Sequence, residues 1–261
     1  MPNGLIVHGC NRNETQYLYQ EIFEEQIYLP RDGADLGPAP VVFDVGANIG
    51  MFTLFAADRW PGARIFAFEP APGTFEVLRR NVGRRPGVRA CNIALGDRPQ
   101  QRDLIFYPRY TMMSGFDADP AADRALVRAY VENIAAAQTD ERRRQVLLDE
   151  VDELLEGRFD EPQTIPCTVE RLDTVAAGLG VERIDLLKVD VEGFETQVLD
   201  GVGETLWPRI RHAVVEVEGR DPQLAAVLDR FARHGLRTTV EQPADYRGTE
   251  VFTVYAARTA P

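Results

Sequence analysis

Short apolar runs alternate with segments of helical spacing from residue 41 onward. Apolar runs occur at 41–45, 63–69 and 88–94, and segments with helical spacing follow the first two, at 50–59 and 72–83. Strands that are buried on both faces of a parallel sheet are nearly continuous apolar runs, and helices connect them. The first half of the chain therefore predicts three parallel strands joined by crossover helices.

A second series of strands begins near residue 183. The runs at 183–190 and 211–218 each precede a helical segment, and the chain ends with two runs, 236–242 and 251–257, on either side of the turn-rich PADYRGTE. The last two runs predict a hairpin. Together the two series predict an α/β, Rossmann-like fold with a seven-stranded, doubly wound and mostly parallel sheet whose last strand is antiparallel.

Two parts of the chain lie outside this strand pattern. Residues 1–40 hold an amphipathic helix at 13–29 and a Pro/Gly-rich linker, and we expect them to form a lid segment before the main domain, 41–261. Residues from about 114 to 162 predict a helical insertion with a mixed-charge face. The insertion is either a solvated excursion or a cap over the crevice at the carboxyl ends of the strands, where α/β sheets bind ligands.

Composition mainly excludes classes of function. The formal net charge of −12 argues against nucleic-acid partners, which need a surplus of Lys and Arg. The sequence shows neither a secretory signal nor an apolar run long enough for a membrane span, so we expect a cytoplasmic protein without a membrane partner. Cys10, Cys91 and Cys167 are too scattered for a disulfide framework or a zinc site, and we predict no metal.

The segment VVFDVGANIGMF, 41–52, leads a strand into the pattern D-x-G-x-N-x-G. Gly46 and Gly50 permit a tight turn against which a ligand can lie, and the following helix points its amide donors at the same place. A dinucleotide needs G-x-G-x-x-G, but Asn48 occupies the position of the second glycine. Asp44 would repel phosphate and attract an amine. The turn therefore predicts an amine-bearing ligand without pyrophosphate.

The next two strands end in groups that suit a nucleoside. Glu69 follows Gly50 by nineteen residues, at the end of the second strand, where a carboxylate usually accepts both hydroxyls of a ribose. The segment NIALGD, 92–97, offers apolar surface for adenine at the end of the third strand. Ribose, adenine and an amine without phosphate describe S-adenosylmethionine. We assign its binding to Asp44, Gly46, Asn48, Gly50, Glu69, Ala94 and Asp190.

Several of these motifs resemble one family. FDVGANIGMFTLF, FAFEPAPGTFEVLRRNV, CNIALGD and IDLLKVDVEGFETQVLDGV are similar to the FkbM-type methyltransferases, a class I S-adenosylmethionine-dependent family, and the similarity runs from about residue 40 to 258. FYPRYTMMSGFDAD, 106–119, and NRNETQYLYQEIF resemble the subgroup that occurs alone or within polyketide and nonribosomal peptide synthases. The resemblance implies the seven-stranded methyltransferase fold and methyl transfer to a hydroxyl oxygen of a natural product.

The catalytic candidates lie where the fourth and fifth strands end. A sulfonium methyl is already activated, so the protein must align the acceptor and take its proton. Lys188 and Asp190 share one face of the fourth strand, and Glu192 follows where a helix begins. Glu216 lies within an apolar strand, where a lone carboxylate is costly unless paired, liganded or shifted in pKa. Glu218 ends that strand, and whether it joins Asp190 around a divalent cation stays open.

The substrate candidates come from the loop FYPRYTMMSG and from the end of the fifth strand. By analogy with the family we expect Tyr107, Tyr110 and Ser114 to contact the substrate, together with Glu218. Family members often carry His at the position of Glu218, so a mechanism based on histidine is in doubt here. His212 is at the start of that strand, which is the wrong end for catalysis.

The leading hypothesis is therefore O-methylation of a small secondary-metabolite acceptor, free or bound to an acyl carrier protein. An acidic carrier would need a basic patch such as Arg142–Arg144, for which a solvated helix face is the favoured interpretation. Two alternatives remain open: a nicotinamide-dependent oxidoreductase, which the missing glycine disfavours, and a non-catalytic module that binds S-adenosylmethionine.

Overall fold

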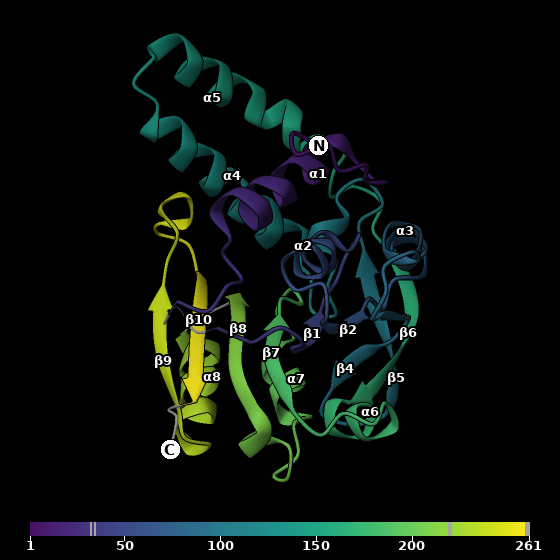
Figure 1. Cartoon of the computed structure of the whole chain (residues 1–261). Helices are drawn as coiled ribbons and strands as arrows, with labels where there is room; N and C mark the ends of the chain where they lie inside the picture. The colour runs from purple at the N-terminus through teal and green to yellow at the C-terminus, as the bar shows by residue number, and fades with distance from the viewer. Residues whose placement is uncertain (32, 34, 219–220, 259–261) are drawn as a thin grey trace.

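The structure is a computed structural model that describes residues 1–31, 33, 35–218 and 221–258. Its centre is a seven-stranded sheet in the order β3-β2-β1-β7-β8-β10-β9 (Figure 1). Only β10 runs antiparallel to its neighbours, which confirms the predicted fold. The strands of this sheet are β1 (Val41–Val45), β2 (Arg64–Phe68), β3 (Val88–Cys91), β7 (Ile184–Val189), β8 (Ile210–Glu218), β9 (Leu236–Glu241) and β10 (Val251–Arg258).

Helices cover both faces of this sheet because its strands are apolar on both sides. Phe43 and Val45 pack in one core with α6, α7 and α8, whereas Val42, which points to the opposite face of β1, packs in another with α2 and the N-terminal segment. The helices concerned are α2 (Met51–Arg59), α3 (Pro72–Val82), α6 (Leu172–Gly178), α7 (Glu195–Asp200) and α8 (Asp221–Arg233).

A second, three-stranded sheet was not predicted. Its strands, in the order β4-β6-β5, are β4 (Ala94–Gly96), β5 (Gln100–Phe106) and β6 (Gln163–Arg171). The run at 88–94 is therefore not one strand. The chain leaves the main sheet after Cys91, and the Asn92 side chain holds this bend by donating to the carbonyl oxygens of Glu69 (2.8 Å) and Pro70 (2.9 Å). Ala94 then begins the second sheet.

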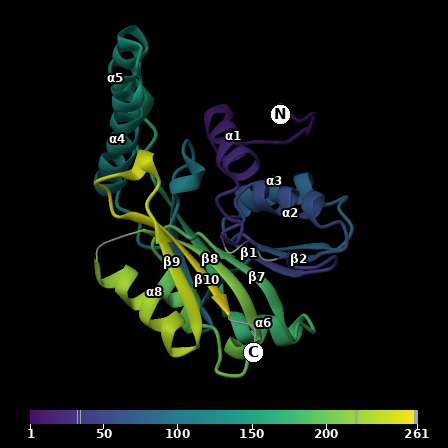
Figure 2. The same cartoon turned by 60° about the vertical axis from the view of Figure 1, so that its left-hand side comes forward.

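The N-terminal segment lies over the carboxyl ends of the parallel strands (Figures 1 and 2). The helix expected at 13–29 is two pieces, α1 (Arg12–Tyr19) and the π-helical η1 (Gln20–Glu25). It stops at Gln26, whose left-handed backbone (φ 54°) ends helical geometry. Tyr255 donates a hydrogen bond to the carbonyl of Ile27 (2.8 Å), which fixes the segment to β10.

The stretch between β5 and β6 contains two long helices, α4 (Pro120–Ala137) and α5 (Glu141–Leu155). Asp119 and Asp140 cap their N-termini by accepting backbone hydrogen bonds. Figure 2 shows the pair standing out from the sheet as a hairpin. In the part of the chain that is described, no helix combines the length and the apolar character needed to cross a bilayer.

Candidate active site

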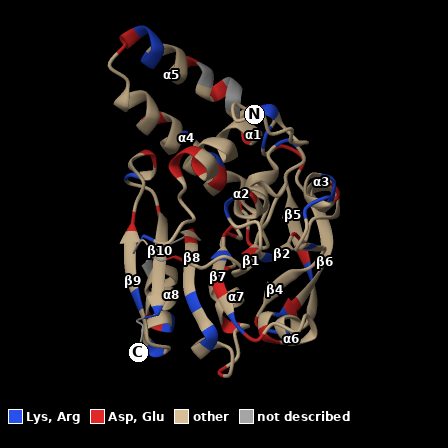
Figure 3. Cartoon of the chain, viewed as in Figure 1, with Lys and Arg blue, Asp and Glu red and all other residues tan. Residues whose placement is uncertain are grey.

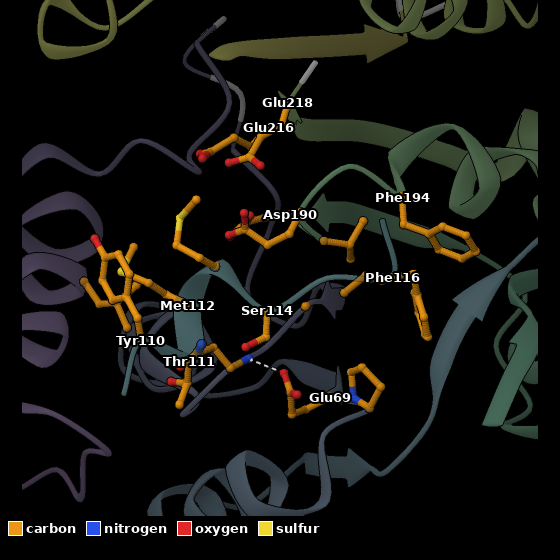
Figure 4. Close-up of a pocket in the computed structure, with 18 of the residues that line it drawn as sticks. Glu69, Tyr110, Thr111, Met112, Ser114, Phe116, Asp190, Phe194, Glu216 and Glu218 are labelled. Atoms are coloured by element: carbon orange, nitrogen blue, oxygen red, sulfur yellow. Dashed lines mark hydrogen bonds between the residues drawn. The ribbon is translucent and has the colours of Figure 1, made fainter. Parts of the chain in front are cut away.

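A hollow at the carboxyl ends of β1, β2, β7 and β8 brings most of the predicted residues together. We call it the first hollow; it contains about 1160 Å³ of space between protein atoms, including its open mouth. Figure 4 shows Glu69 on one side and Asp190, Glu216 and Glu218 on the other, with Ser114 between them. The predicted residues that line it are Gly46, Asn48, Glu69, Ala94, Tyr110, Ser114, Asp190, Glu192, Glu216 and Glu218.

The two glycines of the first turn have different roles. Gly46 (φ 77°) lines the first hollow, and a Cβ there would lie 1.7 Å from the carbonyl oxygen of Asp190, so only glycine lets the ends of β1 and β7 approach. Gly50 (φ 87°) does not line it. A Cβ on Gly50 would meet Leu78 Cδ1 at 2.6 Å, so this glycine lets α2 pack on α3. The expectation that Gly50 contacts the ligand is corrected accordingly.

Glu69 is held rigidly at the end of β2. Its Oε2 accepts a hydrogen bond from the backbone amide of Asn48 (3.0 Å), and its Oε1 accepts one from the amide of Ala71 (2.9 Å). Each carboxylate oxygen keeps a further lone pair for a ribose hydroxyl. Burial raises the pKa of Glu69 to about 7, although the hydrogen bonds from Ala71 and Asn48 act to lower it.

We expect the affinity for S-adenosylhomocysteine to fall with pH through this group. A pKa near 7 means that Glu69 is protonated at lower pH, when it no longer accepts two hydroxyl protons. The affinity should fall by up to about tenfold for each pH unit below 7. Glu69→Gln should bind at least about tenfold more weakly at pH 8 and lose most of this pH dependence.

Isothermal titration calorimetry between pH 5.5 and 8.5 measures this effect. Glu76→Gln is the matched control because Glu76 lies on the exposed face of α3, paired with Arg79 (2.7 Å). If Glu69→Gln kept both the affinity and the pH profile of the parent protein, Glu69 would not bind the ribose.

Asp44 and Lys188 form a buried pair behind the first hollow. They are cross-strand neighbours on β1 and β7, and Lys188 Nζ lies 3.4 Å from Asp44 Oδ1 and 3.2 Å from Asp190 Oδ2. Lys188 also donates to the carbonyl of Gly46 (2.7 Å), and Thr53 donates to Asp44 (2.5 Å). Neither Asp44 nor Lys188 lines the hollow.

Two predictions change as a result: that Asp44 binds the cofactor and that Lys188 is catalytic. Asp44 is fully buried, so it does not meet a cofactor amine; desolvation raises its pKa, against the attraction of Lys188. Desolvation acts to lower the pKa of Lys188, but the attraction of Asp190 and Asp44 outweighs it and the pKa is raised. Lys188 is therefore a positively charged structural residue: it orients Asp190 and the Gly46 turn, and it does not line the hollow.

Asp190 and Glu216 share one partner that the sequence did not single out. The Tyr28 hydroxyl lies 2.9 Å from Asp190 Oδ2 and 3.3 Å from Glu216 Oε2, within donating distance of both. The Lys188 ammonium lies 5.0 Å from the centre of the Tyr28 ring. Burial, followed by repulsion from Asp190, raises the pKa of Glu216 well above its usual range.

Glu192 and Glu218 form a hydrogen-bonded carboxyl pair at the far side of the first hollow. Burial, then repulsion from Glu218, raises the pKa of Glu192 well above its usual range, whereas the pKa of Glu218 rises to about 7 through burial. Glu192 is therefore the protonated member that donates to Glu218. Figure 3 shows further acidic residues on η1, above the same strand ends.

The predicted substrate loop contributes only partly. Tyr110 and Ser114 line the first hollow, but Tyr107 does not. The Tyr107 side chain is fully buried and its hydroxyl donates to Asp123 Oδ2 (2.7 Å). The expectation that it contacts substrate is corrected: Tyr107 stacks edge-on against Phe159 in the core beneath α4 and α5.

The N-terminal segment was expected to form a lid, but none of its residues was predicted to be part of the site. Its residues Tyr17, Leu18, Glu21 and Tyr28 line the hollow directly. Glu14 is buried and accepts two hydrogen bonds from Thr111, which tie α1 to the loop before α4. The amphipathic spacing indicated a helix, but Glu14 and Tyr28 meet partners 97 and 162 residues away, so no local signal could have found these contacts.

Apolar residues shape the hollow beside Glu69. Phe116 and Phe194 lie with ring centroids 4.8 Å apart, and both line the hollow together with Ala94 and Leu95. Among the residues that the structure describes, no group of three or more His, Cys, Asp or Glu side chains is arranged to hold a metal ion. The site thus combines an apolar recess, a carboxylate for a diol and a separate acidic wall.

Comparison with known proteins defines the family. The family model of the methyltransferase FkbM domain matches residues 44–238. The chain belongs to the FkbM methyltransferase family. It is 43% identical over its whole length to the 31-O-demethyl-FK506 methyltransferase FkbM of Streptomyces tacrolimicus, of which the match covers 96%. It is 41% identical over 99% of its length to the AMB antimetabolite synthetase AmbE of Pseudomonas aeruginosa, and spans only 12% of that protein.

A solved FkbM methyltransferase from Methylobacillus flagellatus KT shares the fold, with a TM-score of 0.52 at 12% identity over 93% of this chain and 54% of the other. As an FkbM-family member the chain is a methyltransferase whose methyl donor is S-adenosylmethionine, which confirms the predicted cofactor. This result disfavours the nicotinamide-dependent alternative and the non-catalytic one.

Proposed function

We propose that this FkbM-family methyltransferase methylates a hydroxyl oxygen of a polyketide- or peptide-type natural-product intermediate. The relative from Streptomyces tacrolimicus is named for a 31-O-demethyl-FK506 acceptor, and it matches this chain from end to end. The observation that carries the proposal is the acidic wall of Asp190 and Glu216, which share the Tyr28 hydroxyl on the side of the hollow facing Glu69.

The residues of the first hollow divide between cofactor and acceptor. Bound S-adenosylmethionine would supply an activated methyl group. Glu69 would accept the ribose hydroxyls, and the backbone at Gly46 and Asn48 would allow close approach of the rest of the nucleoside. Adenine would lie in the apolar recess between Phe116 and Ala94.

The acidic wall would then accept the proton of the acceptor. An alcohol gains a methyl group only as its proton leaves, and a positioned carboxylate can take it. Glu216 suits this role because burial and the neighbouring Asp190 raise its pKa and so make it a stronger base. Asp190 is held by Lys188 (3.2 Å) and Tyr28, so it would keep Glu216 and the acceptor in place.

The state of the acceptor and the compartment complete the proposal. We infer that the acceptor is a small molecule, free or attached to an acyl carrier protein, because the match to AmbE covers part of a protein named as a synthetase. The compartment proposed is the cytoplasm. Arg142, Arg143 and Arg144 are exposed on α5, and a solvated helix face remains the interpretation we favour for them.

Incubation with S-adenosylmethionine carrying a ¹³C-labelled methyl group tests this function. The acceptors are 31-O-demethyl-FK506 and a β-hydroxyacyl group, the latter free and loaded on an acyl carrier protein. We expect labelled methyl on an oxygen, identified by carbon NMR and mass spectrometry, with at least one of them. Label on nitrogen or carbon alone, or tight cofactor binding without transfer to any hydroxyl acceptor, would contradict the proposal.

A further inference from the structure

A second hollow adjoins the first and is unused by the chemistry described so far. It contains about 1040 Å³ of space between protein atoms, including its mouth, and lies between α4, the β9–β10 connection and the loop before α7. Four residues line both hollows: Met113, Leu126, Glu192 and Glu218. These side chains form a shared partition between the two spaces.

The partition is built from groups that can move apart. Met113 lies on the short 3-10 turn η2 (Thr111–Met113), and its unbranched thioether side chain adapts readily to different neighbours. Glu192 and Glu218 meet through a hydrogen bond between their carboxyl groups, which an acceptor hydroxyl or amide can replace. The partition also borders the acidic wall where Glu216 would receive the acceptor proton.

One wall of the second hollow consists of small side chains of α4, and the opposite wall is the β9–β10 connection, which hydrogen bonds hold in place. Ala122, Ala125 and Ala129 follow each other at helical spacing on α4 and leave room beside it. On the other side, Asn133 of α4 donates to the carbonyl oxygens of Asp245 and Arg247, both at 2.9 Å. The β9–β10 connection is thereby fixed against α4, so the space between them is preformed.

The polar lining selects against anions. Asp117, Asp123 and Glu250 join Glu192 and Glu218, and none of the described residues around this hollow is Lys or Arg. Gln223 also lines it; its amide nitrogen donates to the Gly193 carbonyl (3.4 Å), whereas its buried Oε1 has no hydrogen-bond partner. An O–H or N–H group of a ligand, or a water molecule, can donate to an acceptor oxygen of this kind.

We propose that the second hollow is an extension of the acceptor site. The acceptor would pass the Glu192–Glu218 partition, with its reacting hydroxyl at Glu216 and an uncharged, hydroxyl- or amide-bearing portion along the alanine wall of α4. This inference rests on the proposed function and adds that the acceptor is elongated and carries no anionic group in this portion. A hydroxyl or amide of the acceptor in the second hollow would offer a hydrogen-bond donor to the Gln223 oxygen.

Chain-bearing cofactor analogues test the inference without a known acceptor. The probes are S-adenosylhomocysteine analogues in which nitrogen replaces sulfur and carries an oligo(ethylene glycol) chain of increasing length, ending in hydroxyl or in phosphate. The variants are Ala125→Trp and Ala122→Trp, both at exposed positions in the alanine wall. Ala136→Trp is the matched control, since Ala136 lies about three helical turns beyond Ala125 on α4 and lines neither hollow.

In the parent protein and in Ala136→Trp we expect affinity to rise about tenfold once the chain reaches the second hollow, and a terminal phosphate to cancel this gain. Both alanine-wall variants should lose the gain while binding S-adenosylhomocysteine normally and melting at the parent temperature. Equal length dependence in all proteins, or tighter binding of the phosphate-ended chain, would overturn the inference. Failure of S-adenosylhomocysteine itself to bind would instead contradict the proposed function.

Discussion

Glu216→Gln is expected to lower the rate of methyl transfer by about 10²- to 10⁴-fold, the usual contribution of a general base. The amide keeps the shape of the side chain and can still accept a hydrogen bond from the Tyr28 hydroxyl, which lies 3.3 Å from Glu216 Oε2 in the parent protein. It cannot take up the proton of the methyl acceptor. Single-turnover rates with the acceptor found by the ¹³C-methyl assay measure the effect. Affinity for S-adenosylhomocysteine should be unchanged.

The pH profile separates this role from a structural one. In the parent protein the rate should rise with pH as Glu216 loses its proton, because burial holds the pKa of this carboxyl above its usual range. Glu216→Gln should lose that limb of the profile. Glu241→Gln is the control, since Glu241 lies at the exposed end of β9, paired with Arg31. A parent-like rate in Glu216→Gln would move the role of base to Asp190.

Lys188→Met is expected to lower the free energy of unfolding by about 3–5 kcal/mol, the typical cost of leaving a buried partner charge uncompensated. Lys188 is 3% exposed and Asp44 is not exposed at all, so water cannot replace the ammonium. The substitution also removes the hydrogen bond to the Gly46 carbonyl (2.7 Å), so affinity for S-adenosylhomocysteine should fall as well. Urea denaturation measures the change in stability.

A second substitution distinguishes the buried charge from lost packing. Lys188→Met combined with Asp44→Asn should recover part of the stability, because the amide of Asn does not need a counter-charge. Arg31→Met is the comparison at the surface. Its partner Glu241 is 43% exposed, and the cost should stay below about 1 kcal/mol. A double variant no more stable than Lys188→Met would mean that the pairing of Lys188 with Asp44 contributes little.

Residues of the candidate site could be predicted from the sequence where a recognisable motif lies at the end of a strand. Glu69, Asn48 and Gly46 lie at the ends of β1 and β2, and parallel strands bring such ends to one edge of the sheet. Asp190 was predicted for the same reason, whereas Glu216 was singled out as a lone carboxylate within an apolar strand, β8. The prediction that Asp44 binds the cofactor failed because Asp44 precedes the last residue of β1. Its side chain is therefore buried beside Lys188 on the neighbouring strand β7.

The sequence by itself determined the seven-stranded, mostly parallel sheet with its antiparallel last strand, the cofactor class and the family, because these depend on apolar runs and short motifs within a few residues of each other. Only the tertiary structure decided that Tyr28 joins Asp190 to Glu216, that Tyr107 is buried under α4, and that the Glu192–Glu218 pair separates two hollows. These contacts join residues that are 16 to 188 positions apart in the sequence. The local spacing of residues cannot predict such pairings, because the packing of whole helices and strands brings these residues together.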